Sequence, residues 1–377
     1  MQLVLTEDQE LLAKTAADFV AEKSPVARMR KLRDSDDPTG FSRELWKEMA
    51  ELGWVGIPFE EVHGGADMGL AELAVVLEAL GRTLAPEPFL STVLLGGRAL
   101  AAGGDDGQRA EWIPRIASGD AIVALAYQEA RSRHDPHHVT TRASADGGTH
   151  RITGEKLQVL DGHVADLLIV SARTAGEADD ADGISLFAVA PGADGVEIVR
   201  QRRIDERNAA LVRLTAAPGE PVGSVGDGAA LLDHAIAGAT VGLCAEMLGS
   251  MQEALDRTIA YMKVREQFGV PIGSFQALKH RAARLFIAIE LCRSSVMAAA
   301  RAVDSDDAEA GKLVSLAKAV CSDAAIQVGN EAVQLHGGIG MTDEHDIGFY
   351  LKRARAAEMS FGDAAWHRRR FAELSGY

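Results

Sequence analysis

The chain turns sharply between two long helix-forming segments, at VREQFGVPIGSFQ (Val264–Gln276). Gly269, Pro271 and Gly273 all interrupt helices, and they lie close together in this stretch. The guanidinium of Arg265, just before the turn, can hold a pyrophosphate through paired hydrogen bonds, and the flat ring of Phe268 can cover an adenine. The turn is therefore a candidate phosphate-binding site as well as a helix break.

A second glycine-rich turn, QLHGGIG (Gln334–Gly340), ends a later helical segment. Its glycines let the backbone come close to a phosphate-bearing ligand, and the amide of Gln334 adds a directional hydrogen bond. Each motif alone has a simpler interpretation, because an arginine before a turn is usually a solvated helix cap and HGGIG usually only ends a helix. The two motifs in this order indicate a cofactor site.

The sequence around these motifs predicts a helical bundle. After Gly228 the only proline is Pro271, and glycine is sparse outside the two motifs. Long helices are therefore expected over residues 228–266, 275–303, 307–334 and 343–370. Long helices joined by short turns favour an up-and-down four-helix bundle.

The preceding segment, from Ala121 to Pro221, has short runs rich in valine, isoleucine and threonine, separated by glycine and aspartate turns. Such runs predict strands of a compact antiparallel barrel or sandwich. The first hundred residues are helical in pattern, with a capping box at Thr6, an N-cap at Ser42, and apolar helices over 70–84 and 89–102. The expected domains are a helical domain over 1–118, a β domain over 119–222 and a bundle over 223–377.

Composition narrows the class of protein. The chain has 377 residues, 47% of them hydrophobic and 25% charged, which suits a folded protein of two or three domains. Its three cysteines, Cys244, Cys292 and Cys321, lie in apolar helical segments and are expected to be buried and reduced.

The charge and hydropathy patterns weigh against two classes of partner. The net charge of −16 is spread along the chain, which disfavours binding to nucleic acid or to an anionic membrane. We see no signal sequence and no apolar run of about 18 residues, so we expect no membrane insertion and a cytoplasmic location. The histidine-rich stretch His134–His138 reads as a polar loop, and no metal is expected.

Taken together, the motifs resemble those of the acyl-CoA dehydrogenase family, and the resemblance covers the whole chain. LAELAVVLEALGR (Leu70–Arg82) and GEKLQVLDGHVADLLIVSAR (Gly154–Arg173) are also similar to segments of that family. GIGMTDEHDIGFYLKR and FGDAAWHRRRFA carry a narrower likeness, to the small subunit of pimeloyl-CoA dehydrogenase and to actinobacterial subunits of heteromeric acyl-CoA dehydrogenases.

This resemblance implies a fold and an activity. Family members have an N-terminal helical domain, a β-barrel and a C-terminal four-helix bundle. They hold FAD between barrel and bundle, oxidise acyl-CoA thioesters to 2-enoyl-CoA, and pass electrons to an electron-transfer flavoprotein or a similar acceptor. The cofactor residues that carry over are Arg265, Gln267, Phe268, Gln334, Gly337 and Gly338.

The chain departs from the family at the catalytic base. The family supplies it as the glutamate of Glu-Gly-Thr, and the matching residues here are Phe361, Gly362 and Asp363. A phenyl ring cannot accept a proton. Some members place the glutamate on the first bundle helix, where Ala239 stands here, and Glu246 lies two turns further on, too far to replace it.

The flavin-ring segments of the β domain have changed as well. Thr-Glu-Pro, Gly-Ser-Asp and Trp-Ile-Thr of the family are replaced, respectively, by Gln128-Glu129-Ala130, Arg133-His134-Asp135 and Gln158-Val159-Leu160. In the family one subunit's bundle motifs grip the adenine and pyrophosphate of a FAD whose ring is held by another subunit. This chain therefore resembles a subunit that completes the FAD site of a catalytic homologue, within a heterotetramer.

Three alternatives remain open. The chain could be a self-sufficient homo-oligomer that uses Asp363 or Glu358 as its base. It could be a flavin monooxygenase of the same fold, which needs no base for an α proton. It could also be a non-enzymatic assembly subunit that keeps the bundle alone.

Overall fold

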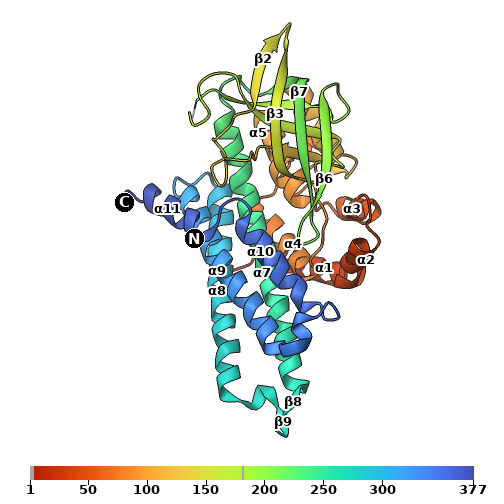
Figure 1. Ribbon diagram of the computed structural model, residues 1–377, viewed down its shortest axis with the longest axis vertical. Helices are drawn as coiled ribbons and strands as arrows, with labels where there is room; N and C mark the ends of the chain where they lie inside the picture. The colour runs from red at the N-terminus through yellow and green to blue at the C-terminus, as the bar shows by residue number, and fades with distance from the viewer. Residues whose placement is uncertain (1–3, 181) are drawn as a thin grey trace. The chain divides into compact units, whose positions relative to one another are not determined.

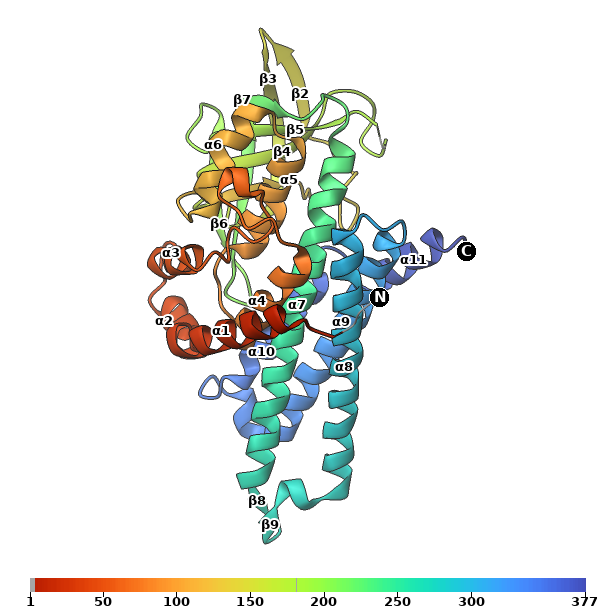
Figure 2. The same ribbon diagram turned by 180° about the vertical axis from the view of Figure 1, so that it is seen from behind.

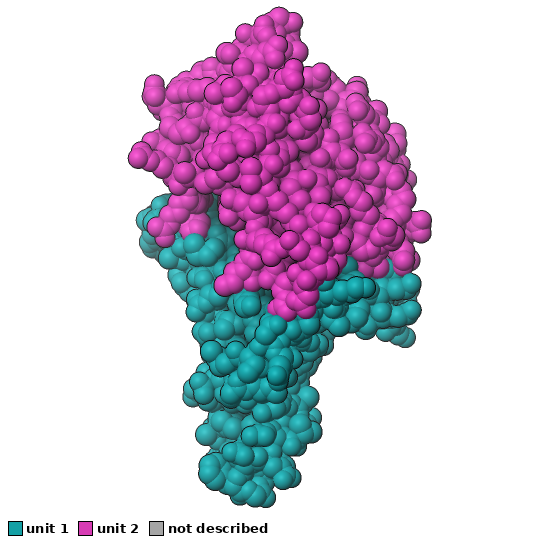
Figure 3. Space-filling model, turned by 45° about the vertical axis from the view of Figure 1, so that its right-hand side comes forward, with its two compact units in different colours: residues 1–31, 70–85, 240–377 teal, residues 32–69, 86–239 magenta. Residues whose placement is uncertain are grey.

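The computed structural model describes residues 4–180 and 182–377 (Figure 1). The chain forms two compact units, which Figure 3 colours separately. Unit 1 contains Met1–Lys31, Leu70–Ala85 and Thr240–Tyr377, and unit 2 contains Leu32–Gly69 and Pro86–Ala239. The three-domain boundaries expected from the sequence stay a prediction.

Unit 1 is helical. In both views α7 (Gly228–Val264), α8 (Gln276–Asp304), α9 (Ala310–His336) and α10 (Ile347–Met359) run side by side as a bundle (Figures 1 and 2). The other elements are α1 (Glu7–Lys23), α2 (Val26–Asp34), α4 (Leu70–Arg82), β8 (Glu266–Gln267), β9 (Val270–Pro271), η3 (Ile272–Ser274), η4 (Gly337–Met341) and α11 (Ala364–Leu374). The capping box of Thr6 and Gln9 is confirmed, with both reciprocal hydrogen bonds present.

The expectation of one helix over 343–370 is wrong. The segment forms two helices, α10 and α11, which are separated at Ser360–Asp363. Phe361 has φ of 59° and Gly362 has φ of 106°. An α-helix requires negative φ, so these two residues end α10.

The helices α4 and α7 approach each other so closely that only glycine fits at the crossing. A Cβ on Gly249 would lie 1.8 Å from the carbonyl oxygen of Glu78, and a Cβ on Gly81 would lie 2.1 Å from that of Glu246. The hydroxyl of Ser250 donates to the carbonyl of Gly81 over 2.9 Å. This crossing sets the position of Glu246 along the axis of the bundle.

The three cysteines lie in the bundle core as predicted. Cys244, Cys292 and Cys321 are fully buried and unpaired by disulfide, on α7, α8 and α9 respectively. Hydrogen bonding to the other two thiols, together with burial, raises the pKa of Cys321 well above its usual value. The Cys321 thiol therefore stays protonated at neutral pH.

Unit 2 holds a seven-stranded sheet made of β1 (Val123–Ala126), β2 (Arg142–Asp146), β3 (Thr149–Leu160), β4 (Leu167–Arg173), β5 (Ile184–Val189), β6 (Val196–Arg202) and β7 (Asn208–Val222). The pairings run β4-β2-β3-β7-β5 and return to β4, so the sheet closes into a barrel around a core that includes Ile152, Val170 and Phe187. The expected β domain is confirmed, but a fully antiparallel barrel is wrong, because β1 and β2 pair with β4 in parallel.

The helical elements of unit 2 are α3 (Arg43–Glu51), η1 (Glu61–His63), η2 (Phe89–Gly97), α5 (Arg98–Gly103) and α6 (Asp106–Ala117). Ser42 caps α3 as predicted, by accepting a hydrogen bond from the amide of Leu45. The helix expected over 89–102 differs, since Phe89–Gly97 is wound as a π-helix. Gly96 packs there against Val123 of β1, where a Cβ would lie 2.6 Å from the valine side chain.

Among the residues that the structure describes, one helix is long and apolar enough to cross a membrane. This helix is α7, and 61% of its most apolar window is buried inside the structure. Core helices of folded proteins pass the same test of length and composition. The finding is weak evidence for a membrane span.

We predict that Gly249→Ala destabilises unit 1 strongly. The added methyl group would overlap the α4 backbone, and forced overpacking typically costs about 1–3 kcal/mol or more. Gly311→Ala is the matched control, because the nearest atom to its Cβ is a leucine methyl at 3.4 Å. Thermal unfolding should show a clear loss for the first variant and none for the second. Equal melting temperatures would contradict the close crossing.

Candidate active site

The residues that the resemblance assigns to the adenine and pyrophosphate gather at one end of the bundle, and we call Arg265, Gln267, Phe268, Gln334, Gly337 and Gly338 the bundle-end surface. In the hairpin of β8 and β9, Gln267 pairs with Val270. Phe268, at its tip, is 93% exposed and has φ of 56°. Arg265 and Gln334 are exposed too.

The second glycine motif follows α9 directly. Gly337 ends the helix with φ of 65°, and a Cβ on Gly337 or Gly338 would meet no atom within 4 Å. The backbone there is open to a ligand. An exposed guanidinium, a flat exposed ring and two unobstructed glycines fit the pyrophosphate and adenine of a dinucleotide.

The segment that the resemblance assigns to the base lies in the break between α10 and α11. Phe361 is 7% exposed, so its ring is buried. Its carbonyl accepts a hydrogen bond from Nε2 of His367 at 2.9 Å. The carbonyl of Gly362 accepts one from Nζ of Lys318 at 2.7 Å. The backbone is thus fixed on both sides of a residue that cannot take a proton.

Lys318 organises this segment from α9. Its ammonium also donates to the carbonyl of Glu358 at 2.9 Å and to the hydroxyl of Ser322 at 3.0 Å. Burial lowers the pKa of Lys318 to about 8, although nearby cysteine and carboxylate groups raise it. The group remains mostly charged at neutral pH, as three oxygen acceptors require.

The two alternative bases are engaged elsewhere. Asp363 caps α11, where its carboxylate accepts a hydrogen bond from the amide of Trp366 at 2.8 Å. Glu358 lies in the last turn of α10, with its carboxylate 3.7 Å from the guanidinium of Arg355. Neither residue lines the two cavities described below.

The altered flavin-ring segments of unit 2 are built around a buried ion pair. Nζ of Lys156 lies 2.6 Å from Oε1 of Glu129, and both side chains are almost fully buried. Glu129 also accepts hydrogen bonds from the amides and hydroxyls of Thr140 and Thr141. The amide of Leu157 donates to the carbonyl of Gln128 over 2.8 Å, so the residue just before the Gln158–Leu160 segment is bonded to the first segment.

Both members of this pair are charged at neutral pH. Burial raises the pKa of Glu129, but the Lys156 ammonium and the donated hydrogen bonds outweigh burial and lower it to about 2. Burial lowers the pKa of Lys156 to about 8 against the opposing effect of Glu129. The pair is a structural element of the barrel.

Unusual backbone conformations coincide with the assigned positions. Eleven non-glycine residues in the described ranges have positive φ, and four of them are Arg133, Gln158, Phe268 and Phe361. Gln158 lies at a bulge, where the β3–β7 register shifts. Such conformations are costly and cluster at functional sites. Here they persist although three of these four positions carry changed side chains.

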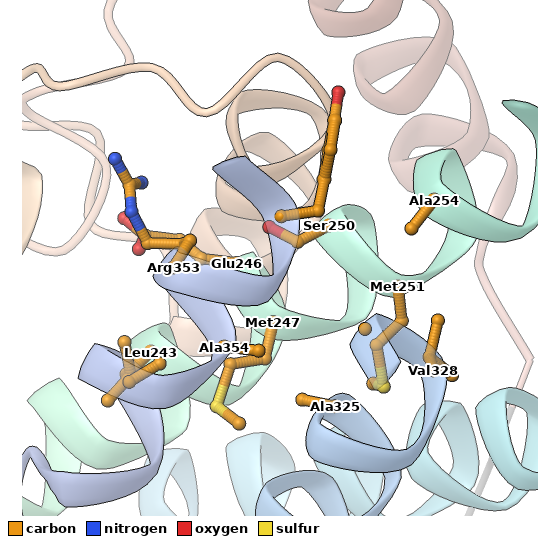
Figure 4. Close-up of a pocket in the computed structure, with 13 residues that line it drawn as sticks. Leu243, Glu246, Met247, Ser250, Met251, Ala254, Ala325, Val328, Arg353 and Ala354 are labelled. Atoms are coloured by element: carbon orange, nitrogen blue, oxygen red, sulfur yellow. The ribbon is translucent and has the colours of Figure 1, made fainter. Parts of the chain in front are cut away.

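The bundle contains one narrow cavity, shown in Figure 4, between α7, α9 and α10. Its volume is about 20 Å³, enough for about one water molecule. Glu246 and Arg353 lie at one end of it, with side chains that point toward each other, and Met247 and Met251 fill the apolar part. Glu246 is buried, but a cavity of this size cannot admit an acyl chain.

A larger hollow of about 330 Å³ lies among α8, α9 and α11. Leu291, Leu316 and Phe371 give it apolar walls, and Asp323 and Arg368 form an ion pair at its edge. None of the bundle-end residues and none of the base-segment residues 360–363 line it.

The histidine-rich stretch forms hydrogen bonds to carboxylates within unit 2. Nε2 of His137 lies 3.0 Å from Asp233, and Nδ1 of His138 contacts Asp179. Within residues 4–180 and 182–377, no three histidine, cysteine, aspartate or glutamate side chains are arranged to hold a metal ion.

Sequence reasoning missed the residues that support the site. Lys318 is a single charged residue in the apolar stretch LVSLAKAVCS, and a buried charge must find partners, so that pattern was a usable signal. Lys156 follows Glu155 directly and gave no such signal. Nothing in the sequence identified which carbonyl oxygens Lys318 would bind, because both lie forty residues or more further along the chain.

Comparisons with known proteins agree with this geometry. Family models of acyl-CoA dehydrogenases match the N-terminal domain over residues 6–120, the middle domain over 124–215 and the C-terminal domain over 226–375. The acyl-CoA dehydrogenase IpdE2 of Mycobacterium tuberculosis is 32% identical over 355 residues, which cover 93% of this chain and 92% of that protein.

Two solved structures are similar along the whole chain. A chain of the ChsE4–ChsE5 complex from Mycobacterium tuberculosis has a TM-score of 0.90 at 28% identity, covering 100% of this chain and 99% of that one. A chain of the Tcur3481–Tcur3483 steroid ACAD has a TM-score of 0.88 at 30% identity, covering 98% of both. The resemblance, the fold class, the oxidoreductase class and FAD as the cofactor are confirmed.

We predict that Glu129→Gln destabilises unit 2 by about 3–5 kcal/mol at neutral pH, because it leaves the Lys156 ammonium buried without its counter-charge. The carboxylate contributes fully above its unfolded pKa of 4.5, and this contribution is lost as the pH falls toward about 2. The difference between wild type and variant should therefore shrink over that range in denaturant unfolding.

Glu197→Gln is the control for this prediction, because its pair with Arg213 is exposed and should contribute less than about 1 kcal/mol. A difference for Glu129→Gln that stays constant down to pH of about 2 would contradict the charged pair.

Proposed function

Because the chain belongs to the acyl-CoA dehydrogenase family, we propose that it is a subunit without a base of its own, which completes the FAD site of a catalytic homologue. The observation that carries the proposal is Phe361, a buried phenyl ring at the position where the family places its glutamate. The complex would carry out 2,3-desaturation of an acyl-CoA thioester.

The reaction demands a base that this chain does not offer. FAD, when bound, accepts the hydride from the β carbon, so the α proton must pass to a base. A positioned base contributes about 10²–10⁴-fold to such a step. Phe361 cannot take the proton, Asp363 is held as a helix cap, and Glu358 lies beside Arg355. The base must then come from a homologous subunit.

The bundle-end surface is suited to binding the adenine and pyrophosphate of FAD. The exposed guanidinium of Arg265 would bind the pyrophosphate, the ring of Phe268 would cover the adenine, and the amide of Gln334 would add a directional hydrogen bond. The open backbone at Gly337 and Gly338 would leave room for the phosphates. These residues would bind and orient the cofactor, and none of them would transfer a proton.

The rest of the assembly follows from this division. The partner would be a homologous subunit that carries the glutamate, and the assembly would be a heterotetramer. Two similar solved structures are named as pairs of proteins, the ChsE4–ChsE5 complex and Tcur3481–Tcur3483, which supports such a pairing. Electrons would pass to an electron-transfer flavoprotein or a similar acceptor in the cytoplasm.

We predict that the chain purified alone holds far less than one FAD per chain and does not desaturate acyl-CoA. Co-purified with its catalytic homologue, it should give one FAD per pair of chains, measured by flavin absorbance. Stoichiometric flavin together with turnover from the lone chain would overturn the proposal.

Within that complex, Arg265→Ala should weaken FAD binding about ten- to a hundredfold, because one hydrogen-bonded charge on the pyrophosphate is lost. Arg284→Ala removes an exposed positive charge from α8 and serves as the control. Equal FAD affinity for both variants would show that Arg265 does not contact the cofactor.

We predict that Asp363→Asn and Glu358→Gln leave kcat of the complex unchanged. Asparagine also caps helices, so the first variant removes the carboxylate while it preserves α11. Steady-state assays at saturating acyl-CoA would measure this. A loss of about a hundredfold or more in either variant would favour a self-sufficient chain that uses that residue as its base.

A further inference from the structure

Three aromatic rings join the two cofactor motifs inside unit 1. Tyr261 lies one turn before Arg265, whose amide donates to its carbonyl over 2.8 Å. The ring of Tyr261 stacks on His336, with centroids 4.6 Å apart and planes 24° apart. His345 follows η4, and its ring centroid lies 4.5 Å from that of His336, with the two planes tilted by 51°. Since His336 directly precedes Gly337, the rings connect both halves of the bundle-end surface.

One hydrogen bond defines which ring nitrogen of His336 carries the hydrogen. Its Nδ1 lies 2.7 Å from the carbonyl oxygen of Ala332, which can only accept, so Nδ1 carries the hydrogen. The residue is 3% exposed, and Nε2 is buried with no hydrogen-bond partner among the described residues. A proton on Nε2 would therefore have no acceptor.

The charges around the rings also disfavour a proton. Arg257 lies one turn before Tyr261 on α7, and its guanidinium pairs with Glu253 at 2.9 Å and with Asp346 at 3.4 Å. Asp346 also pairs with Arg30 of α2 at 2.7 Å. Both carboxylates are thus already committed to arginines, and a cationic His336 would face Arg257.

The pKa shifts of His336 and His345 also favour the neutral rings. Burial lowers the pKa of His336, and His345 and Arg257 lower it further, although the hydrogen bond to Ala332 opposes them. Burial also lowers the pKa of His345. Both histidine rings are neutral near neutral pH in the folded chain, and the stability that depends on their neutral form is lost as the pH falls below 6.5, the usual pKa of histidine.

We propose that His336 is a positioning residue, which holds the two cofactor motifs in one fixed arrangement through its stack on Tyr261 and its tilted ring contact with His345. The stack depends on a neutral imidazole, so acidification loosens both motifs together. This inference rests on the proposed function only for its consequence, which is weaker binding of FAD.

Hydrogen exchange of the full chain tests the coupling without FAD. His336→Ala should raise exchange about two- to tenfold at residues 337–346 and also at 262–276, the factor expected for loss of an aromatic contact. His336→Asn retains a donor for Ala332 but no ring, and should behave like the alanine variant. His336→Phe retains the ring and should match wild type. A change confined to 337–346 in the alanine variant would overturn the proposal.

The pH dependence separates this role from a merely structural one. Between about pH 8 and about pH 5, after correction for intrinsic exchange, wild type should lose protection in both segments. His336→Phe should lose little, because its ring cannot be protonated. His163→Phe is the control, since burial lowers the pKa of that histidine too, but it lies in unit 2. Equal pH dependence in wild type and His336→Phe would refute the neutral stack.

The FAD measurement distinguishes the two proposals. In the complex, His336→Ala should weaken FAD binding about two- to tenfold while His336→Phe leaves it unchanged. If Arg265→Ala has no effect on FAD, the proposed function fails, and the exchange results still decide whether His336 couples the motifs. If Arg265→Ala weakens FAD and His336→Ala does not, the positioning role fails alone.

Discussion

The ammonium of Lys318 determines the backbone at the position where the family keeps its base. It binds the carbonyls of Glu358 and Gly362, one on each side of Phe361, and so fixes the break between α10 and α11. A buried cation costs several kcal/mol unless oxygen acceptors surround it. The carbonyl of Glu358, at the carboxyl end of α10, carries the negative end of that helix dipole, which favours a cation there. Any residue at position 361 would have to adopt this backbone conformation, with φ of 59°.

The backbone geometry at these positions is therefore found without the side chains that the family uses there for its chemistry. Phe361, Gln158 and Arg133 keep left-handed conformations at positions whose family side chains are gone. Each such residue costs of the order of 1–3 kcal/mol, a noticeable part of a stability of about 5–15 kcal/mol. The buried Glu129–Lys156 pair and the Lys318 contacts hold these conformations in place. Unusual backbone conformations are therefore present at these positions, whereas the side chains that the family places there are not.

The sequence predicted what depends on local chemistry. The capping box at Thr6, the cap at Ser42 and the buried cysteines follow from side-chain preferences, and all three are confirmed. The break at Phe361 was missed because a non-glycine residue with positive φ has no local signature, and its cause, Lys318, lies on another helix. The parallel pairing of β1 with β4 was missed for the same reason, since strand order is set by long-range contacts.

The two parts of the site face different environments, and this explains how one could change while the other stayed. Phe361 is buried, so an aromatic ring there avoids the desolvation cost of a carboxylate, which would need a partner or a shifted pKa at this position. Phe268 is the opposite case, because its phenyl ring is 93% exposed and gains little from folding beyond an edge contact with Phe275. Burying such a ring is worth about 1.5–3 kcal/mol. That energy becomes available only when something covers the bundle end, which is what a shared cofactor and a partner subunit would do.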